Sequence, residues 1–257
     1  MNLRPSNVLR KLRSGSVASC IKINTADSRV TEIASLCGFD CVWTDMEHVA
    51  NNWNVIESQI LSAKAYNTDC IVRVARGSYS DHVRPLELDA SGIMVPHVMS
   101  LEDARKVVWM TKFHPIGRRA LDGGNADGSY CMVDKDDYIT QANRERFLMI
   151  QIEDPEPMDD LDLICSLEGI DIIFFGPGDF SQGIGDPGNL KNPRLLDARR
   201  LVAETAIKHG KFAGTVGSSA NLKELYDIGY RFISVGADVV GLTKYFRDIL
   251  ASFISIT

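Results

Sequence analysis

Eight short segments rich in apolar and β-branched residues recur along the 257-residue chain, and they alternate with longer segments of a different pattern. In the longer segments apolar residues return every three or four positions, which indicates helices. Strands that are apolar on both faces and joined by helices are typical of a buried parallel sheet. The predicted strands are residues 16–23, 41–46, 70–75, 92–98, 147–153, 171–176, 211–216 and 232–236, and the predicted helices are residues 27–38, 53–66, 81–90, 101–113, 158–169, 193–210, 221–230 and 243–253.

Eight strand–helix units in about 250 residues favour a single (β/α)8 TIM barrel over residues 1–257. An open, doubly wound sheet would show the same alternation and stays possible on pattern alone. Its G-x-G-x-x-G fingerprint after the first strand is absent, however. A short amphipathic segment at residues 8–12 predicts a helix before the barrel that covers one of its ends.

The charge and composition argue against several classes of protein. A net charge of −6 and a pI of about 5.4 do not suit a nucleic-acid binder, which needs a basic face. No segment reaches the roughly 18 consecutive apolar residues of a membrane span, and the N-terminal residues lack the apolar run of a signal peptide. The six cysteines form no C-x-x-C pair, which favours reduced buried thiols over a zinc site. We expect a cytoplasmic enzyme without nucleic-acid or membrane partners.

One long segment interrupts the alternation. Residues 114–146, between the fourth predicted helix and the fifth predicted strand, are rich in glycine and carry no clear helical pattern. Long segments of this kind in compact domains are usually functional or disordered. Active sites of barrels lie at the carboxyl ends of the strands, and we expect the segment there. Its Arg118 and Arg119 would then bind an anionic substrate or a neighbouring subunit.

Polar residues interrupt or follow four of the predicted strands. Asp45, Glu47 and His48 follow the second strand and Arg73 lies within the third. Acidic residues end the fifth strand and follow the sixth, at Glu153 and Asp179 respectively. Because the carboxyl ends of all barrel strands meet at one rim, we expect these side chains to converge there.

Glu153 and Asp179 are hard oxygen ligands on neighbouring strand ends. Such carboxylates suit Mg²⁺ or Mn²⁺, which keep several waters and let a substrate complete the coordination. The alternative is purely structural, with Glu153 paired to an arginine and Asp179 capping the turn after the sixth strand. In the same turn, the glycines around Pro177 expose backbone N–H groups that could hold a carboxylate.

His48 and Arg73 supply the remaining chemistry. His48 follows two acids in DMEH, and a histidine oriented by a carboxylate is the usual general base near neutral pH, although His48 could also be a partly buried, hydrogen-bonded structural residue. A guanidinium on an apolar strand must meet anions, either a substrate or, in a structural ion pair, Asp45 or Glu47. The other histidines show no ligand-like spacing and are expected to be surface or packing residues. His97, near the end of the fourth strand, is the possible exception.

Together these residues resemble the HpcH/HpaI aldolase family, the class II pyruvate aldolases. The resemblance extends from about Asn7 to about Gly236. Its strongest segments are GFDCVWTDMEH (38–48), IVRV (71–74), GIMVPHV (92–98), IQIEDPE (150–156) and GIDIIFFGPGDFS (169–181). The resemblance implies a TIM barrel, usually assembled as a homo-hexamer whose C-terminal helix packs across a subunit boundary. It also implies an enzyme that cleaves a 4-hydroxy-2-oxo acid to pyruvate and an aldehyde.

The resemblance also implies roles for residues of the metal half of the site. Glu153 and Asp179 match the ligands of a divalent metal, which could be Mg²⁺, Mn²⁺ or Co²⁺. Gln151 matches a glutamine beside the metal. Gly178 and Asp179 lie where backbone amides meet the pyruvate carboxylate.

Other matched residues would take part in the chemical step. His48 matches a histidine that serves in proton transfer, with Asp45 as its orienting partner. Arg73 matches an arginine that contacts the keto oxygen of the substrate. The metal would make a Schiff base unnecessary, and Lys22, near the end of the first strand, is the one lysine close to such a position.

Three positions depart from the family pattern. Where the family carries an Asp contributed to a neighbouring active site, this chain has Glu87, and a slip in register would substitute Asp89. The Arg–Gly pair after the fourth helix reads Arg119–Ala120, with Arg119 as a substrate-binding residue by position. The first strand ends in KINTADS (22–28) in place of W-x-x-x-x-x-P. These changes point to a different acceptor or a related reaction.

Three other functions remain open on the sequence. The same metal-enolate chemistry serves oxaloacetate decarboxylation and cleavage of malyl- or citramalyl-CoA. A non-catalytic barrel could bind a 2-oxo acid as a sensor or scaffold. Glycines after the seventh and eighth strands could instead hold a phosphorylated substrate.

Overall fold

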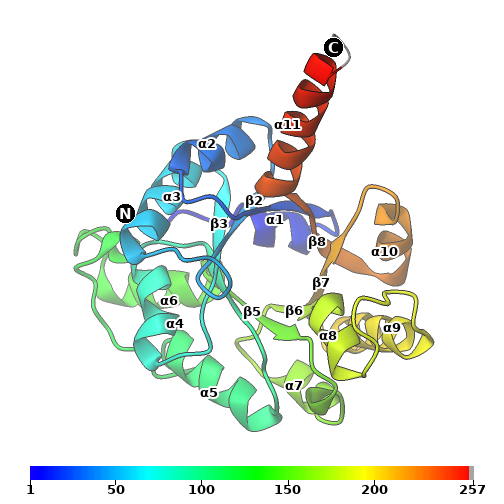
Figure 1. The fold of residues 1–257 in the computed structure, drawn as a ribbon. Coiled ribbons are helices and arrows are strands. Elements are labelled where there is room, and N and C mark those ends of the chain that lie inside the picture. The colour runs from blue at the N-terminus through cyan, green and yellow to red at the C-terminus, as the bar shows by residue number, and fades with distance from the viewer. Residues whose placement is uncertain (255–257) are drawn as a thin grey trace.

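Eight parallel strands close into a barrel in the computed structural model, which describes residues 1–254. Each strand pairs with the next along the chain, and the eighth pairs with the first. The predicted (β/α)8 fold is therefore confirmed, with helices arranged around the strands (Figure 1). The strands are β1 (Ala18–Ile23), β2 (Cys41–Asp45), β3 (Asp69–Arg73), β4 (Gly92–Val95), β5 (Phe147–Ile152), β6 (Ile172–Phe175), β7 (Phe212–Gly217) and β8 (Tyr230–Ala237).

All the predicted helices are present, and the structure adds two that the sequence did not predict. One is α6, where only every third or fourth residue is buried in an otherwise polar sequence; the other is α8, where the sequence suggested a turn. The α-helices are α1 (Asn7–Arg13), α2 (Ser28–Leu36), α3 (Trp53–Ala65), α4 (Tyr79–Glu87), α5 (Leu101–Thr111), α6 (Lys135–Glu145), α7 (Leu161–Ser166), α8 (Pro177–Gly183), α9 (Pro193–Lys208), α10 (Leu222–Ile228) and α11 (Asp238–Ile254); η1 (Ala126–Gly128) and η2 (Glu156–Met158) are 3-10 helices. In residues 1–254 no helix is long and apolar enough to cross a membrane.

The strands bury side chains on both faces. Alternate residues fill the barrel interior, where Trp43, Phe174 and Phe232 meet in edge-to-face contacts, and the others pack against the helices. This double burial explains why the strands appear in the sequence as continuous apolar runs. Polar side chains can therefore point into the barrel only at its ends.

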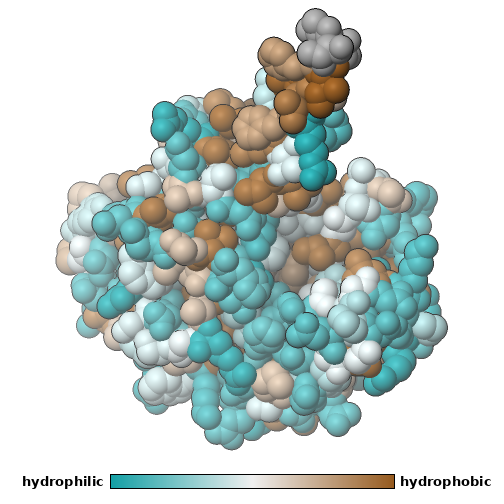
Figure 2. Space-filling view, in the orientation of Figure 1, coloured by the Kyte–Doolittle hydropathy of each residue, from teal (hydrophilic) through white to brown (hydrophobic). Residues whose placement is uncertain are grey.

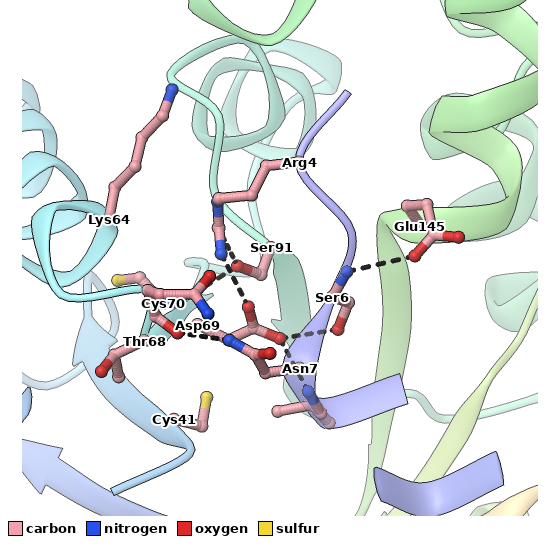
Figure 3. Close-up of polar contacts among 12 residues, drawn as sticks. Arg4, Ser6, Asn7, Cys41, Lys64, Thr68, Asp69, Cys70, Ser91 and Glu145 are labelled. Carbon is pink, nitrogen blue, oxygen red and sulfur yellow. Dashed lines mark hydrogen bonds and ion pairs between the residues drawn. The ribbon is translucent and has the colours of Figure 1, made fainter. Parts of the chain in front are cut away.

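The N-terminal segment closes the amino end of the barrel. Asp69, at the start of β3, is fully buried and accepts hydrogen bonds from Arg4 Nη1 at 2.9 Å, Ser6 Oγ at 2.6 Å and Val8 N at 2.9 Å (Figure 3). Glu145 of α6 accepts from Ser6 N, which ties the same segment to a second element. The predicted helix before the barrel thus covers one of its ends, as expected.

The glycine-rich segment runs along the outside of the barrel. It leaves α5 beside the start of β5, where Lys112 Nζ donates to Arg146 O. Its middle reaches the first residue of α4, where Ala120 N donates to Tyr79 Oη at 2.6 Å. Because α4 begins at the carboxyl end of β3, the middle of the segment lies at the carboxyl end of the barrel, as predicted. The two ends of the segment lie elsewhere.

Helix α11 extends away from the barrel (Figure 1). Its first residue, Asp238, is bonded to the β1–α2 connection through Asn24 N and Thr25 N. Beyond this anchor the helix exposes large apolar side chains, which form the brown projection in Figure 2. They are Val239, Val240, Leu242, Tyr245, Phe246, Ile249, Leu250, Phe253 and Ile254.

Replacing the buried Asp69 by asparagine tests the closure at the amino end. Asp69→Asn keeps the shape of the side chain but leaves Arg4 without its counter-charge, so the free energy of unfolding should fall by about 3 kcal/mol. Denaturant unfolding measures the change. The control Asp227→Asn, which removes an exposed pair with Lys223, should cost less than about 1 kcal/mol. Equal stability of Asp69→Asn and the wild type would show that the buried pair does not hold this segment.

Candidate active site at the carboxyl end of the barrel

A buried ion pair joins the ends of β2 and β3. Arg73 donates to both oxygens of Asp45, from Nε at 3.0 Å and from Nη2 at 2.5 Å. Lys22, at the end of β1, lies 2.7 Å from the same carboxylate through its Nζ. Asp45 Oδ1 also accepts the backbone N–H of Glu47. The carboxylate is therefore surrounded by donors from three neighbouring elements.

The two cations hold Asp45 in its ionised form. Burial alone would raise the pKa of Asp45, but the hydrogen bonds and charges of Arg73 and Lys22 outweigh it and lower this pKa to about 2. Both cations also lie over the ring of Trp43, with centroid distances of 4.9 Å for Arg73 and 5.0 Å for Lys22. Asp45 thus carries its charge at any pH near neutrality.

A chain of contacts links this pair to β5. Arg73 Nη1 lies 2.9 Å from Glu47, and the other oxygen of Glu47 lies 3.5 Å from His97 Nε2. His97 has a left-handed backbone (φ 48°), and its N–H donates to Glu153 at 2.9 Å. Its Nδ1 lies 2.8 Å from Asp154, and because a carboxylate accepts, Nδ1 is the protonated nitrogen of the ring.

Glu153 directly follows β5 and is only 1% exposed. Burial raises its pKa to about 7, and the nearby charges of Asp179 and Glu47 add to this, against the bonds and charge of His97. Gln151 Nε2 donates to Glu153 Oε2 at 2.7 Å. A buried carboxylate whose pKa is raised by a second carboxylate is a common feature of functional sites.

The surroundings of Glu153 suit a cation. Gln151 Oε1 is buried and accepts no hydrogen bond within residues 1–254, so an acceptor faces this region without a donor. A Cβ atom at Gly176 would lie 2.6 Å from Glu153 Oε2, so the glycine leaves the carboxylate its space. Asp179 lies half-buried in the first turn of α8. The same described residues contain no cluster of three or more His, Cys, Asp or Glu with metal-binding geometry, so water or substrate would have to complete the coordination.

The structure places His48 differently from the sequence-based interpretation. Its side chain is 57% exposed, and its Nε2 lies 3.7 Å from Glu47. Asp45 approaches only the backbone N–H of His48, at 3.4 Å. The expected contact between Asp45 and the imidazole is absent because Arg73 and Lys22 already occupy the carboxylate. The carboxylate beside the imidazole of His48 is that of Glu47.

Glu87 and Asp89 lie outside the barrel wall. Asp89 is buried and accepts from Lys64 at 2.5 Å and from Arg146 at 2.6 Å, which makes it a structural ion pair. Glu87 has no hydrogen-bond or ion-pair partner in the described part of the chain, and burial raises its pKa above the ordinary value. It lines an outer cavity of about 260 Å³ with Trp53, Glu57, Arg84, Leu88, Asn125, Ala126 and Tyr130. Of the two acids, Glu87 is the one free to meet a ligand.

Arg119 lies near Glu87, whose pKa burial raises and the charge of Arg119 lowers, and it contacts none of the predicted residues at the barrel mouth. Its Nη2 donates to Asp127 at 2.6 Å, and its guanidinium lies over the ring of Phe113 at 4.7 Å. The pair is buried on both sides. Within one chain, Arg119 therefore orders the glycine-rich segment and does not face the barrel mouth. Gly178, in contrast, is exposed beside Asp179 at the start of α8.

The sequence named Glu47 only as a possible ion-pair partner of Arg73, a pair that the structure shows, and gave Asp154 no role. Nothing in the spacing of these two acids showed that His97 lies between them. Lys22 was visible as a lysine near a strand end. Its proximity to Asp45 depends on the register of β1 against β2.

Comparison with known sequences identifies relatives over the whole chain. The profile of the HpcH/HpaI aldolase/citrate lyase family matches residues 21–244. A 2-keto-3-deoxy-L-rhamnonate aldolase of Salmonella typhimurium is 30% identical over 258 residues, covering 100% of this chain and 96% of the relative.

Comparison of structures gives the same result. The HpcH/HpaI aldolase of Desulfitobacterium hafniense superimposes with a TM-score of 0.89 at 25% identity, over 95% of each chain. The citrate synthase SbnG superimposes with a TM-score of 0.87 at 26% identity, over 96% of each chain. The resemblance that the sequence motifs predicted is confirmed: this chain belongs to the HpcH/HpaI aldolase/citrate lyase family and is an enzyme of its aldolase type.

Proposed function

We propose that the carboxyl end of this barrel binds a divalent metal and cleaves a 4-hydroxy-2-oxo acid to pyruvate and an aldehyde. The observation that carries the proposal is the position of Glu153. It is a buried carboxylate whose pKa is raised by burial and by the nearby charge of Asp179, and it is connected through His97 and Glu47 to Arg73. The 2-keto-3-deoxy-L-rhamnonate aldolases among the relatives support an aldol cleavage.

Glu153 and Asp179 would hold the cation, with Gln151 beside it. A bound Mg²⁺, Mn²⁺ or Co²⁺ would act as a Lewis acid on the keto oxygen of the substrate. The chain prepares this site by keeping Glu153 buried and oriented, through the N–H of His97 and the amide of Gln151. Such support of a ligand is how proteins fix metal geometry.

Arg73 would contact the keto oxygen. Arg73 donates two of its five N–H groups to Asp45, and its Nη1 lies 2.9 Å from Glu47 without a hydrogen bond, so N–H groups remain for a substrate. Its position is fixed from both sides by those carboxylates. At the other end of a pyruvate unit, the N–H groups of Gly178 and Asp179 in the first turn of α8 face outward without helical acceptors and would bind the carboxylate.

His48 would move the proton of the 4-hydroxyl group. It lies on the rim, is open to solvent, and has Glu47 beside its ring. A solvent-exposed imidazole can exchange its proton with water after each turnover, which a general base requires. Asp45 would act indirectly, by fixing Arg73 and the backbone that carries His48.

Removing the metal or its ligands should abolish pyruvate release. Chelation should stop cleavage of 4-hydroxy-2-oxo acids, and added Mg²⁺ or Mn²⁺ should restore it. Glu153→Gln and Asp179→Asn should each lower kcat/KM by about 10³-fold or more, since each leaves the cation with one charged ligand. A coupled assay for pyruvate measures both effects. The matched control Glu168→Gln, an exposed acid before β6, should keep full activity. Turnover that persists in metal-free protein, or an adduct of pyruvate trapped by borohydride, would contradict the proposal.

Replacing His48 tests the proton-transfer step separately. His48→Asn should lower kcat by about 10²- to 10⁴-fold, the usual contribution of a general base, without weakening the binding of oxalate to the metal-loaded protein. His209→Asn serves as the control, because His209 pairs with Asp162 at the end of α9, outside the site. Unchanged kcat in His48→Asn would assign the proton to another group.

Decarboxylation of oxaloacetate is the second candidate reaction. It needs the same cation and the same contact with the keto oxygen, so the arrangement of Glu153 and Arg73 that supports aldol cleavage supports it equally. Release of pyruvate from oxaloacetate, together with no cleavage of 4-hydroxy-2-oxo acids, would select it. Metal-dependent binding of pyruvate without turnover of either substrate would indicate a binding protein.

The exposed helix α11 supports assembly into a homo-oligomer, with a hexamer as the expected form. Its apolar side chains project beyond the barrel of their own chain (Figure 2), and apolar surface of this size usually contacts a partner. An exchanged α11 would bring copies together and could place Glu87 near the active site of a neighbour.

Introducing charge on α11 tests this assembly. The double variant Phe246→Asp/Phe253→Asp should dissociate the oligomer, because it buries two charges in an apolar contact. Light scattering after size exclusion measures the mass. Lys244→Gln, on a polar position of the same helix, should leave the mass unchanged. A wild-type protein that is monomeric at micromolar concentration would refute the assembly.

A further inference from the structure

Lys22 points into the barrel at its carboxyl end. Alternate residues of β1 fill the interior, since Ala18 and Cys20 belong to the inner core, and Lys22 continues this series. It pairs in register with Trp43 of β2, and its ammonium lies over that ring and beside Asp45. The side chain is 18% exposed, so its end reaches the mouth of the barrel.

The ammonium of Lys22 has unused donors. A lysine carries three N–H groups. Within residues 1–254 the only acceptor for them is Asp45, at 2.7 Å. Asp45 would keep a bonded counter-charge without Lys22, because Arg73 donates to both oxygens of that carboxylate. Two N–H groups in a partly enclosed mouth are thus available to an anionic ligand.

Lys22 also decides the local charge. Arg73 faces two carboxylates, Asp45 and Glu47, so these three residues carry a net charge of −1. Lys22 brings the group to neutrality. Arg73, Asp45 and Glu47 alone would repel a ligand carboxylate approaching this side of the barrel. With Lys22 present, the group has no net charge to repel it.

The barrel topology places Lys22 across from the proposed metal. In a ring ordered β1 to β8, β1 and β5 lie opposite one another, and Glu153 directly follows β5. A substrate held at Glu153 by its oxo-acid end would extend toward β1. We propose that Lys22 binds a carboxylate at the end of the substrate remote from the metal, so that the aldehyde product carries an acidic group. This inference rests on the proposed function, because the metal site sets which end of the substrate is remote.

The sequence departs from the family pattern at this same position. Lys22 opens the segment KINTADS, where the resemblance leads us to expect an aromatic residue followed by a proline. An aromatic side chain offers no charge to a carboxylate, whereas an ammonium does. Glu153, Asp179 and Gln151 keep the family pattern, so this departure bears on the end of the substrate remote from the metal.

Equilibrium binding of matched 2-oxo acids tests the proposal without requiring turnover. The pairs are 2-oxoglutarate with 2-oxopentanoate and 2-oxoadipate with 2-oxohexanoate, which differ only in the distal carboxylate. Calorimetry on Mn²⁺-loaded protein should show the diacid bound about 10- to 100-fold more tightly than its partner in at least one pair, the usual value of a hydrogen bond to a charged group. Lys22→Met should lose this preference and keep the affinity for the monoacid within about threefold.

Two further variants separate charge from structure. Lys22→Arg keeps a cation and should retain most of the preference for the diacid. Lys64→Met removes a lysine that pairs with Asp89 outside the barrel and should leave the preference unchanged. The proposal is overturned if the wild type shows no preference in either pair, or if Lys22→Met keeps it. It is also overturned if that variant weakens diacid and monoacid equally, which would mean that Lys22 acts only through Asp45.

Turnover provides the second readout. In the cleavage assay, Lys22→Met should raise KM for 4-hydroxy-2-oxo acids with a distal carboxylate by about 10-fold or more, and change kcat/KM for neutral analogues less than threefold. Failure of every 4-hydroxy-2-oxo acid to react, together with a diacid preference that depends on Lys22, would reject the aldolase proposal and leave the assignment of Lys22 standing.

Discussion

The buried guanidinium of Arg73 determines how the carboxyl end of this barrel is built. A guanidinium only 4% exposed cannot remain uncompensated, and Asp45 and Glu47 provide its counter-charges from the adjacent strand end. Each of those carboxylates then brings in another residue, Lys22 on one side and His97 on the other. Through His97 the chain of contacts reaches Glu153. The residues proposed for substrate, proton and metal are thus connected through one buried charge.

The buried charged groups at the two ends of the barrel differ in how many of their hydrogen bonds are used within the chain. At the amino end Asp69 is enclosed by donors from Arg4, Ser6 and Val8, and the segment that supplies them closes the barrel (Figure 3). At the carboxyl end the polar groups keep unused capacity, in Gln151 Oε1 and in the remaining N–H groups of Arg73 and Lys22. Satisfied buried hydrogen bonds give rigidity. The unused groups at the carboxyl end are the ones that we propose for binding the metal and the substrate.

The sequence predicted those features that depend on local pattern. Strands buried on both faces appear as apolar runs, and charged residues at their ends locate the rim, so β1 to β8, Glu153, Asp179 and Arg73 could be placed. Helix α6 was missed because its buried stripe is narrow and its sequence polar. Contacts between side chains on different strands could not be predicted from local pattern. The sequence could suggest that an acid orients His48, but the choice between Asp45 and Glu47 depends on which of them Arg73 and Lys22 occupy, and that follows from three-dimensional register.

Glu87 lies apart from the rest of the predicted site within one chain. It ends α4, and the cavity it lines is formed by α3, α4 and the segment around Asn125, all outside the barrel wall. Neither Glu153 nor Arg73 lines this cavity. Asp89, the other residue considered for this role, is already neutralised by Lys64 and Arg146. In the assembly that we propose, Glu87 would act in the barrel of a second copy, and the exposed apolar surface of α11 would hold that copy in place.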